Sequence, residues 1–115
     1  MAEIIKYADA KWEIPDGIEP DEQGRALRRA GLLRGAAGFF SHVIECPPHT
    51  VLPPHSHDHE ELIMVLGGSA TIGDTVLEPF DVVAIDANEV YGITAGDYGL
   101  TFLVVRRGAA SLEVR

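Results

Sequence analysis

Histidine is concentrated in one short stretch of the chain, PPHTVLPPHSHDHEEL at positions 47–62, which holds four of the five histidines and a pair of glutamates. Side chains alternate between the two faces of an extended segment, so His55 and His57 point to the same face, and His59 and Glu61 would join them if the strand ran on unbroken. Two neutral imidazoles and one carboxylate on rigid strands are donors that a divalent transition metal prefers. The stretch therefore predicts a metal site made by His55, His57 and Glu61.

The elements that must hold these side chains are predicted to be β-strands. From residue 37 onward, short β-branched or aliphatic runs each end at Gly, Pro, Asp or Asn, and this punctuation is typical of a sandwich or barrel. Glycine supplies the positive φ that tight hairpin turns need, so we expect such turns at Gly67-Gly68 and at Gly73-Asp74. The sequence therefore predicts an all-β, antiparallel fold.

The 115 residues are enough for one domain with a real core. We expect residues 37–115 to form a β-barrel, with residues 1–36 as an N-terminal arm and edge strands packed on it. Within that arm, the segment DEQGRALRRAGLLRG at 21–35 is compatible with a short helix or with an Arg-rich strand pair, because glycines interrupt its helix formers. Trp12 is expected to anchor the arm.

Charge restricts the partners that the chain can bind. The net charge of −9 argues against nucleic acid and anionic membranes, which proteins bind through clusters of Lys and Arg. All 9 basic side chains lie outside residues 35–105, so the middle of the chain offers no phosphate cradle. If the substrate is anionic, its charge must meet a metal ion or an arginine from the flanks, with these candidates: Arg25, Arg28, Arg29, Arg34 and Arg106.

Other features of the sequence indicate a soluble, cytoplasmic protein. No apolar run approaches the roughly 18 residues of a membrane span, and the first residues carry neither the basic nor the apolar region of a signal peptide. The single cysteine, Cys46, cannot form an internal disulfide. It lies in an apolar run without a nearby cation, so we interpret it as a small buried hydrophobe.

The histidine stretch resembles the first sequence motif of the cupins, Gly-x5-His-x-His-x3-Glu-x6-Gly. His55, His57, Glu61 and Gly68 fall at its spacing, and His49 stands where the motif opens with glycine. The resemblance covers roughly residues 37–106, which is about the size of a whole cupin barrel.

The second cupin motif is Gly-x5-Pro-x-Gly-x2-His-x3-Asn. We align it with the later stretch FDVVAIDANEVYGITA because that stretch has the same expected order of strand, turn and strand. Asparagine can adopt the left-handed conformation of the motif's second glycine. None of the motif residues is matched, and their positions carry Phe80, Asp86, Asn88, Tyr91 and Ala95.

The resemblance implies a small jelly-roll β-barrel that pairs as a homodimer and holds one divalent transition metal per chain. In cupins the metal is iron, manganese, zinc, nickel or copper, bound by the first motif's two histidines and glutamate and by the second motif's histidine. Here Tyr91 stands in the last position, as a phenolate ligand, a proton donor beside the metal, or a filler next to an open site. The other three donors form a 2-His-1-carboxylate set, which favours Fe(II), although Zn(II) takes the same ligands.

Two classes of function follow. In the first, a small organic substrate enters the barrel of a metalloenzyme and undergoes dioxygenase-type oxidation, with Tyr91 and Glu61 as the expected catalytic side chains. A metal-dependent isomerase or lyase is the non-redox version of this class. In the second, the barrel binds a metal or a small effector without turnover, as a sensor. The preserved first motif favours the enzyme, and no glycine fingerprint predicts an organic cofactor.

The remaining histidines have plainer interpretations. His42 and His49 are expected to be structural or to support a ligand. His59 is expected to face solvent or the barrel rim.

Overall fold

The computed structural model describes residues 2–108 and 112–114, which form nine β-strands and two short 3-10 helices, η1 (Tyr7–Asp9) and η2 (Ala36–Gly38). The strands are β1 (Trp12–Glu13), β2 (Arg28–Arg34), β3 (Phe40–Cys46), β4 (Val51–His57), β5 (Glu61–Ile72), β6 (Thr75–Leu77), β7 (Val82–Ile85), β8 (Tyr91–Arg106) and β9 (Leu112–Val114). No helix in these described ranges is long and apolar enough to cross a membrane.

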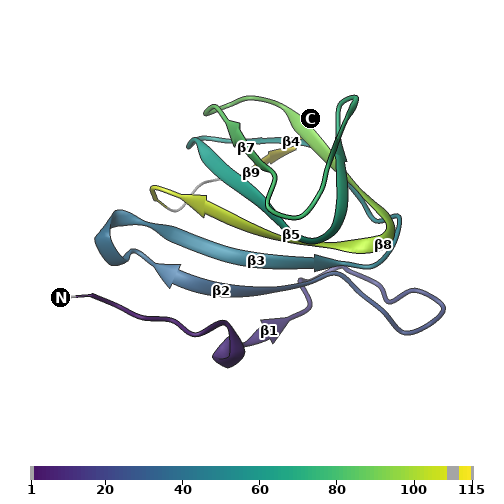
Figure 1. Cartoon of the computed structure of the whole chain (residues 1–115), viewed down its shortest axis with the longest axis horizontal. Helices are drawn as coiled ribbons and strands as arrows, with labels where there is room; N and C mark the ends of the chain where they lie inside the picture. The colour runs from purple at the N-terminus through teal and green to yellow at the C-terminus, as the bar shows by residue number, and fades with distance from the viewer. Residues whose placement is uncertain (1, 109–111, 115) are drawn as a thin grey trace.

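The two longest strands, β5 and β8, organise the barrel. The C-terminal part of β8 pairs with β3 and with the start of β5, whereas its N-terminal part pairs with β4 and with the end of β5. In Figure 1, β2 and β3 lie below β8, and β4, β7 and β9 curve over on its other side. The strand pairs that the structure describes are antiparallel, so the predicted all-β barrel is confirmed.

Alternating burial along β5 faces the start of this strand into the barrel. Glu61, Ile63 and Val65 are buried, whereas Leu62 between them is half exposed, which is the period of a strand with one inward face. Phe102 and Val104 of β8 are buried against them and complete this part of the core. Glu61 is therefore carried into the interior by the same pattern that buries its apolar neighbours.

One of the two predicted hairpin turns is wrong, because Gly67 and Gly68 lie inside β5. Gly68 has φ +70, and a Cβ on it would lie 2.1 Å from the carbonyl oxygen of Gly99 in β8. The glycine thus allows two backbones to approach closely where the β5–β8 register shifts. Gly73 and Asp74 do form the tight turn, joining Ile72 of β5 to Thr75 of β6.

The Arg-rich segment near the N-terminus is a strand, β2, and not a helix. β2 pairs with β3 on one side and with the short β1 on the other, and it sets Ala30 opposite Val43, both fully buried. Trp12 packs beneath the guanidinium of Arg28, whose carbon lies 4.4 Å from the centre of the Trp12 ring. This contact ties the N-terminal segment to the sheet.

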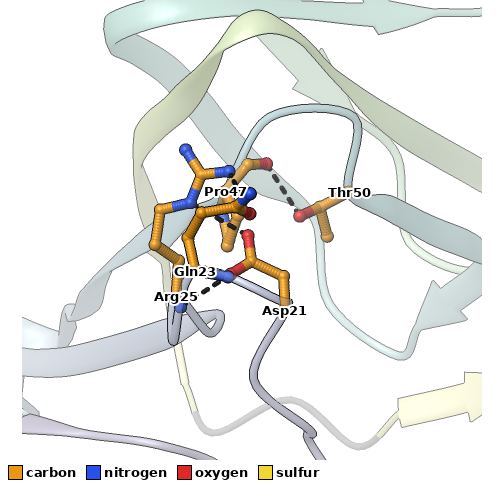
Figure 2. Close-up of polar contacts among 5 residues, drawn as sticks. All are labelled: Asp21, Gln23, Arg25, Pro47 and Thr50. Carbon is orange, nitrogen blue, oxygen red and sulfur yellow. Dashed lines mark hydrogen bonds and ion pairs between the residues drawn. The ribbon is translucent and has the colours of Figure 1, made fainter.

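A turn ahead of β2 is closed by a single carboxylate. Asp21 accepts hydrogen bonds from the backbone N–H of Gln23 at 3.0 Å and of Arg25 at 2.8 Å, and it also pairs with the Arg25 guanidinium at 2.9 Å (Figure 2). In the adjacent β3–β4 connection, the Thr50 hydroxyl donates to the carbonyl of Pro47 at 2.8 Å. Both turns are thus held by side-chain hydrogen bonds to nearby backbone.

Candidate functional site

Three strands bring the predicted site residues to one end of the barrel interior. β4 ends with His55 and His57, β5 begins at Glu61, and β8 begins at Tyr91. The ladder sets His55 opposite Tyr91. It also sets Glu61 opposite Arg106, the last residue of β8. Strand register therefore gathers residues from distant parts of the sequence.

Glu61 is the centre of the polar contacts at this end. Its side chain is only 1% exposed, and its Oε1 accepts a short hydrogen bond from the Tyr91 hydroxyl. Nε2 of His57 lies 3.7 Å from the same oxygen. Nη2 of Arg106 lies 3.4 Å from the other oxygen, Oε2. A buried carboxylate needs such partners, because leaving one uncompensated costs several kcal/mol, on the order of 3–5.

His55 lies beside this group but is held differently. Its Nδ1 is 2.8 Å from the carbonyl oxygen of Pro53, and since a carbonyl only accepts, this nitrogen carries the proton. The ring centre lies 5.1 Å from that of His57 and 4.4 Å from that of Tyr91. A histidine with one nitrogen fixed on a backbone carbonyl keeps Nε2 available, which is how metal-binding histidines are usually oriented.

The donors fit a divalent metal in part. Within residues 2–108 and 112–114, no three His, Cys, Asp or Glu side chains lie close enough together to hold an ion as they stand. However, the 3.7 Å between His57 Nε2 and Glu61 Oε1 suits two ligands that each lie about 2.1 Å from one ion. A metal here would be held by His57 and Glu61, and His55 and Tyr91, which lie beside them, are the candidates for further ligands. It would share Glu61 with Arg106.

A cavity of about 490 Å³ reaches these side chains. This volume is within the range of small-molecule sites in proteins. His42, His55, His57, Glu61, Tyr91 and two arginines, Arg29 and Arg106, line it together with an apolar set: Ile44, Leu52, Ile93, Phe102 and Val104. Pro15 and Ile18 of the N-terminal segment contribute to the wall as well. The cavity is thus mainly apolar, with its polar groups gathered around Glu61.

Burial sets the protonation state of two groups in the cavity. The pKa of Tyr91 is raised above its usual value by burial and by its hydrogen bond to the Glu61 carboxylate, with the Arg106 charge opposing the shift, so the phenol is neutral at pH 7. The pKa of His42 is lowered to about 4, first by burial and then by the positive charges of Arg106 and Arg29. His42 is therefore a neutral imidazole at pH 7.

The residues that the sequence set aside lie away from this group. His49 is exposed, with Nε2 3.6 Å from Asp97 Oδ1. His59 Nδ1 lies 2.9 Å from Oδ1 of its neighbour Asp58, both partly exposed. Cys46 is buried, and burial raises the pKa of its thiol to about 12, so it is an unreactive core residue as expected.

Backbone conformation supports the register of both cupin motifs. His49, Phe80 and Asn88 occupy the positions where the motifs carry glycine, and their φ angles are +64°, +74° and +65°. Non-glycine residues adopt this left-handed region rarely, and a bulky one does so at a cost. Non-glycine residues therefore hold the left-handed backbone at the three positions where the motifs carry glycine. The same register places Tyr91 at the histidine position of the second motif.

Sequence reasoning missed the role of Arg106 beside Glu61. It named Arg106 only as one of five flanking arginines, since nothing in a sequence pairs residue 61 with residue 106. The one available signal was the absence of Lys and Arg from residues 35–105, which means that a cation beside Glu61 must come from one of the two flanks.

Comparison with solved structures shows which fold this arrangement belongs to. The polyketide cyclase RemF from Streptomyces resistomycificus is similar with a TM-score of 0.78 and 24% identity over 99% of this chain and 85% of that one. A candidate acetylacetone dioxygenase from Methylibium petroleiphilum has a TM-score of 0.77 and 14% identity, over 100% of this chain and 82% of that one. A cupin-2 domain from Rhodospirillum rubrum has a TM-score of 0.72 and 18% identity, over 100% of this chain and 81% of that one. No protein-family model and no curated protein matches the sequence.

Proposed function

We propose that this chain, which has the cupin fold, is a small metalloenzyme that oxidises a small organic molecule inside its barrel with O2. The observation that carries the proposal is the cluster of His57, Glu61 and Tyr91 at the end of the 490 Å³ cavity, with His55 beside it. The proposed metal is one divalent ion per chain, Fe(II) in the first instance. When bound, such an ion supplies Lewis acidity and, if it is iron, one-electron chemistry toward O2.

The chain's own residues have separable tasks in this proposal. His55, His57 and Glu61 hold the ion, and the Pro53 carbonyl keeps the His55 ring in one tautomer. Tyr91 is a neutral phenol that donates to Glu61, so it can hold a proton at its oxygen until the substrate needs one. The apolar wall excludes water from the bound molecule, which strengthens each polar contact at the buried end.

A non-redox reaction of the same site is the second candidate. Its support is the Tyr91–Glu61 hydrogen bond, which joins a proton donor and an acceptor inside the cavity, as an isomerase, cyclase or lyase requires. Among the similar structures, one is called a polyketide cyclase and another a candidate dioxygenase. These two names support both chemistries as candidates for a chain with this fold.

Metal binding is tested first, by elemental analysis of protein purified without a histidine tag. We expect close to one transition-metal ion per chain in the wild type and its loss in His57→Ala. His49→Ala is the matched control, because His49 is exposed and lies outside the cavity lining. Equal metal content in the wild type and His57→Ala contradicts the proposed site. Because ligation requires neutral imidazole, metal retention should also weaken as the pH falls through the histidine range.

Oxygen chemistry is tested on protein loaded with Fe(II) under anaerobic conditions. Oxygen consumption is followed with a panel of diketones, catechols, thiols and hydroxy acids, in the wild type and in Tyr91→Phe. We expect uptake with one class and a large loss of rate in Tyr91→Phe. Full iron occupancy without oxygen uptake removes the dioxygenase. Conversion of a panel member without uptake supports the non-redox enzyme, and binding without conversion supports a sensor.

We also propose that the protein is a cytoplasmic homodimer. The dimer is supported by the outer face of β5 and β7, where Leu62 and Val82 are about half exposed on neighbouring strands. Burying such apolar surface against a second copy removes it from water. Light scattering coupled to size-exclusion chromatography should give twice the chain mass, and Leu62→Asp should give the monomer. A monomeric wild type at micromolar concentration contradicts this.

A further inference from the structure

One wall of the cavity carries a row of basic side chains that are not among the proposed metal ligands. The ladder sets Arg29 opposite Ile44 and His42 opposite Gly31 in the β2–β3 pair. In the β3–β8 pair it sets His42 opposite Val104, two residues from Arg106. His42 is thus a diagonal neighbour of both arginines, within reach of their long side chains. All three residues line the cavity.

Arg106 has fewer partners than a buried guanidinium normally has. Its side chain is 14% exposed, and its ion pair with Glu61 Oε2 spans 3.4 Å, longer than the 2.7–2.9 Å that is typical of charge-assisted hydrogen bonds. Its Nε is buried and has no hydrogen-bond partner among the described residues. Because guanidinium carries five N–H donors in a fork that matches a carboxylate, most of this capacity remains for a ligand.

Two arginines line one wall of the cavity although the chain as a whole is acidic. Among the lining residues, Arg29 and Arg106 carry positive charges and Glu61 carries a negative one. Arg29 is also paired with Glu13, with Nε 3.1 Å from Oε1, so part of its charge is already met. Arg106 shares the Glu61 carboxylate and keeps a buried Nε without a hydrogen-bond partner among the described residues. The whole chain has a net charge of −9. A positive wall in an acidic molecule, around a mainly apolar space, favours a ligand with one anionic group and an apolar body.

We propose that the row Arg29, His42 and Arg106 binds the carboxylate of a small monoanionic organic acid whose apolar part fills the cavity. Arg106 supplies the main charge and the donors that Glu61 leaves unused, and the half-exposed Arg29, which also pairs with Glu13, adds a second cation. The His42 ring supplies a neutral hydrogen bond between them. This inference names the substrate class of the proposed function and rests on the same cavity.

The test compares carboxylates with amides of the same shape: acetate with acetamide, benzoate with benzamide, and 2-naphthoate with 2-naphthamide. Binding to the full-length protein is followed at pH 7 by shifts of backbone amide NMR signals, as purified and again after removal of metal with EDTA, so that an anion cannot simply ligate an ion. We expect at least one carboxylate to bind tenfold or more tightly than its amide in both preparations.

Substitutions then locate the preference. Arg106→Gln should bring the carboxylate-to-amide ratio close to one, Arg106→Lys should keep part of it, and Arg29→Gln should lower it severalfold. Arg107→Gln is the matched control, since the neighbouring side chain is exposed, does not line the cavity and loses the same charge. If Arg106→Gln does not fold, the carboxylate-to-amide ratio of Arg29→Gln tests the proposal by itself, because the Arg29 side chain is 53% exposed and its loss should be tolerated.

Two results would overturn the inference. One is a wild type in which no carboxylate is preferred over its amide. The other is a preference that survives in both Arg29→Gln and Arg106→Gln. Because the preference is measured without metal, it can persist when metal uptake or oxygen consumption fails, and it can fail when those succeed, so the two proposals stand or fall separately.

Discussion

Glu61 and Arg106 are directly opposite each other in the β5–β8 ladder, and the Glu61 carboxylate is ion-paired with the Arg106 guanidinium across that rung, with Nη2 3.4 Å from Oε2. The pair is almost completely enclosed, with Glu61 1% and Arg106 14% exposed. It sits beside the Tyr91 hydroxyl and the His57 ring, so one buried carboxylate connects a cation, a phenol and an imidazole.

Removing one member of this ion pair should lower the free energy of unfolding more than its share of the loss when both members are removed. Arg106→Gln leaves the Glu61 carboxylate uncompensated and should lower the free energy of unfolding by about 3–5 kcal/mol. The double variant Glu61→Gln/Arg106→Gln should lose clearly less than the sum of the two single variants, because neither charge is then stranded. The free energies of unfolding of the wild type, the two single variants and the double variant are measured by urea unfolding followed by circular dichroism. Additive losses would show that the two side chains are not coupled.

Tyr91 should resist ionisation in the folded protein. Burial and Glu61 raise its pKa, whereas Tyr7 and Tyr98 are exposed, with Tyr98 95% exposed. In metal-free protein, the phenolate absorbance that belongs to Tyr91, obtained as the ultraviolet difference between the wild type and Tyr91→Phe, should therefore appear only above pH 10. Because the folded-state pKa is raised, the associated stability is present below pH 10 and is lost as the pH rises above it. A Tyr91-dependent signal that rises at or below pH 10 would contradict this contact.

His42 should make the fold sensitive to mild acid. Its folded-state pKa of about 4 lies below the unfolded value of 6.5, so the unfolded chain takes up a proton first as the pH falls. Stability should fall between pH 6.5 and 4 by at most about 3 kcal/mol on this account. Urea midpoints across this range, measured with EDTA present, should show a smaller fall in His42→Gln. The control is His49→Gln, which removes an exposed histidine outside the cavity lining.

Gly68→Ala should strongly destabilise the barrel. The new Cβ would lie 2.1 Å from the Gly99 carbonyl oxygen, so one of the two long strands has to move, and φ is +70 as well. We expect a loss of at least ~2 kcal/mol in urea unfolding. Gly73→Ala separates the two causes, because φ there is +60 but nothing lies within 4 Å. Its loss should be about 1 kcal/mol. Equal losses in the two variants would show that the contact with Gly99 is unimportant.

Phe80→Gly should stabilise the protein, which is unusual for a substitution by glycine. Phe80 has φ +74, which strains the backbone of a non-glycine residue. Its side chain is 75% exposed, so little packing is lost when it is removed. Relief of about 1–2 kcal/mol of strain outweighs the roughly 0.5–1 kcal/mol of added chain entropy in the unfolded state. Phe80→Ala keeps the strain and is the control. A higher melting temperature is expected for Phe80→Gly only.

Local patterns were enough to predict the fold class and to name candidate metal donors. Apolar runs with Gly and Pro punctuation predicted the β-fold, and strand alternation with motif spacing singled out His55, His57 and Glu61 and registered Tyr91 on the histidine position of the second motif. These are relations between residues near in sequence, where a period of two or a fixed spacing carries the information. Where glycine signalled more than one event, as at Gly67-Gly68, the sequence could not distinguish a turn from a close approach of two strands.

Only the tertiary structure decided which distant residues meet. The β5–β8 register places Arg106 against Glu61, and the β2–β3–β8 order puts Arg29 and His42 on the same wall, pairings made across many residues of intervening chain. The protonation of Tyr91 and His42 was likewise beyond the sequence, because burial is the first cause of both shifts. The sequence therefore determined what groups are available. Long-range strand pairing and desolvation determined which of them share a charge, a proton or a ligand, since both exist only in the folded chain.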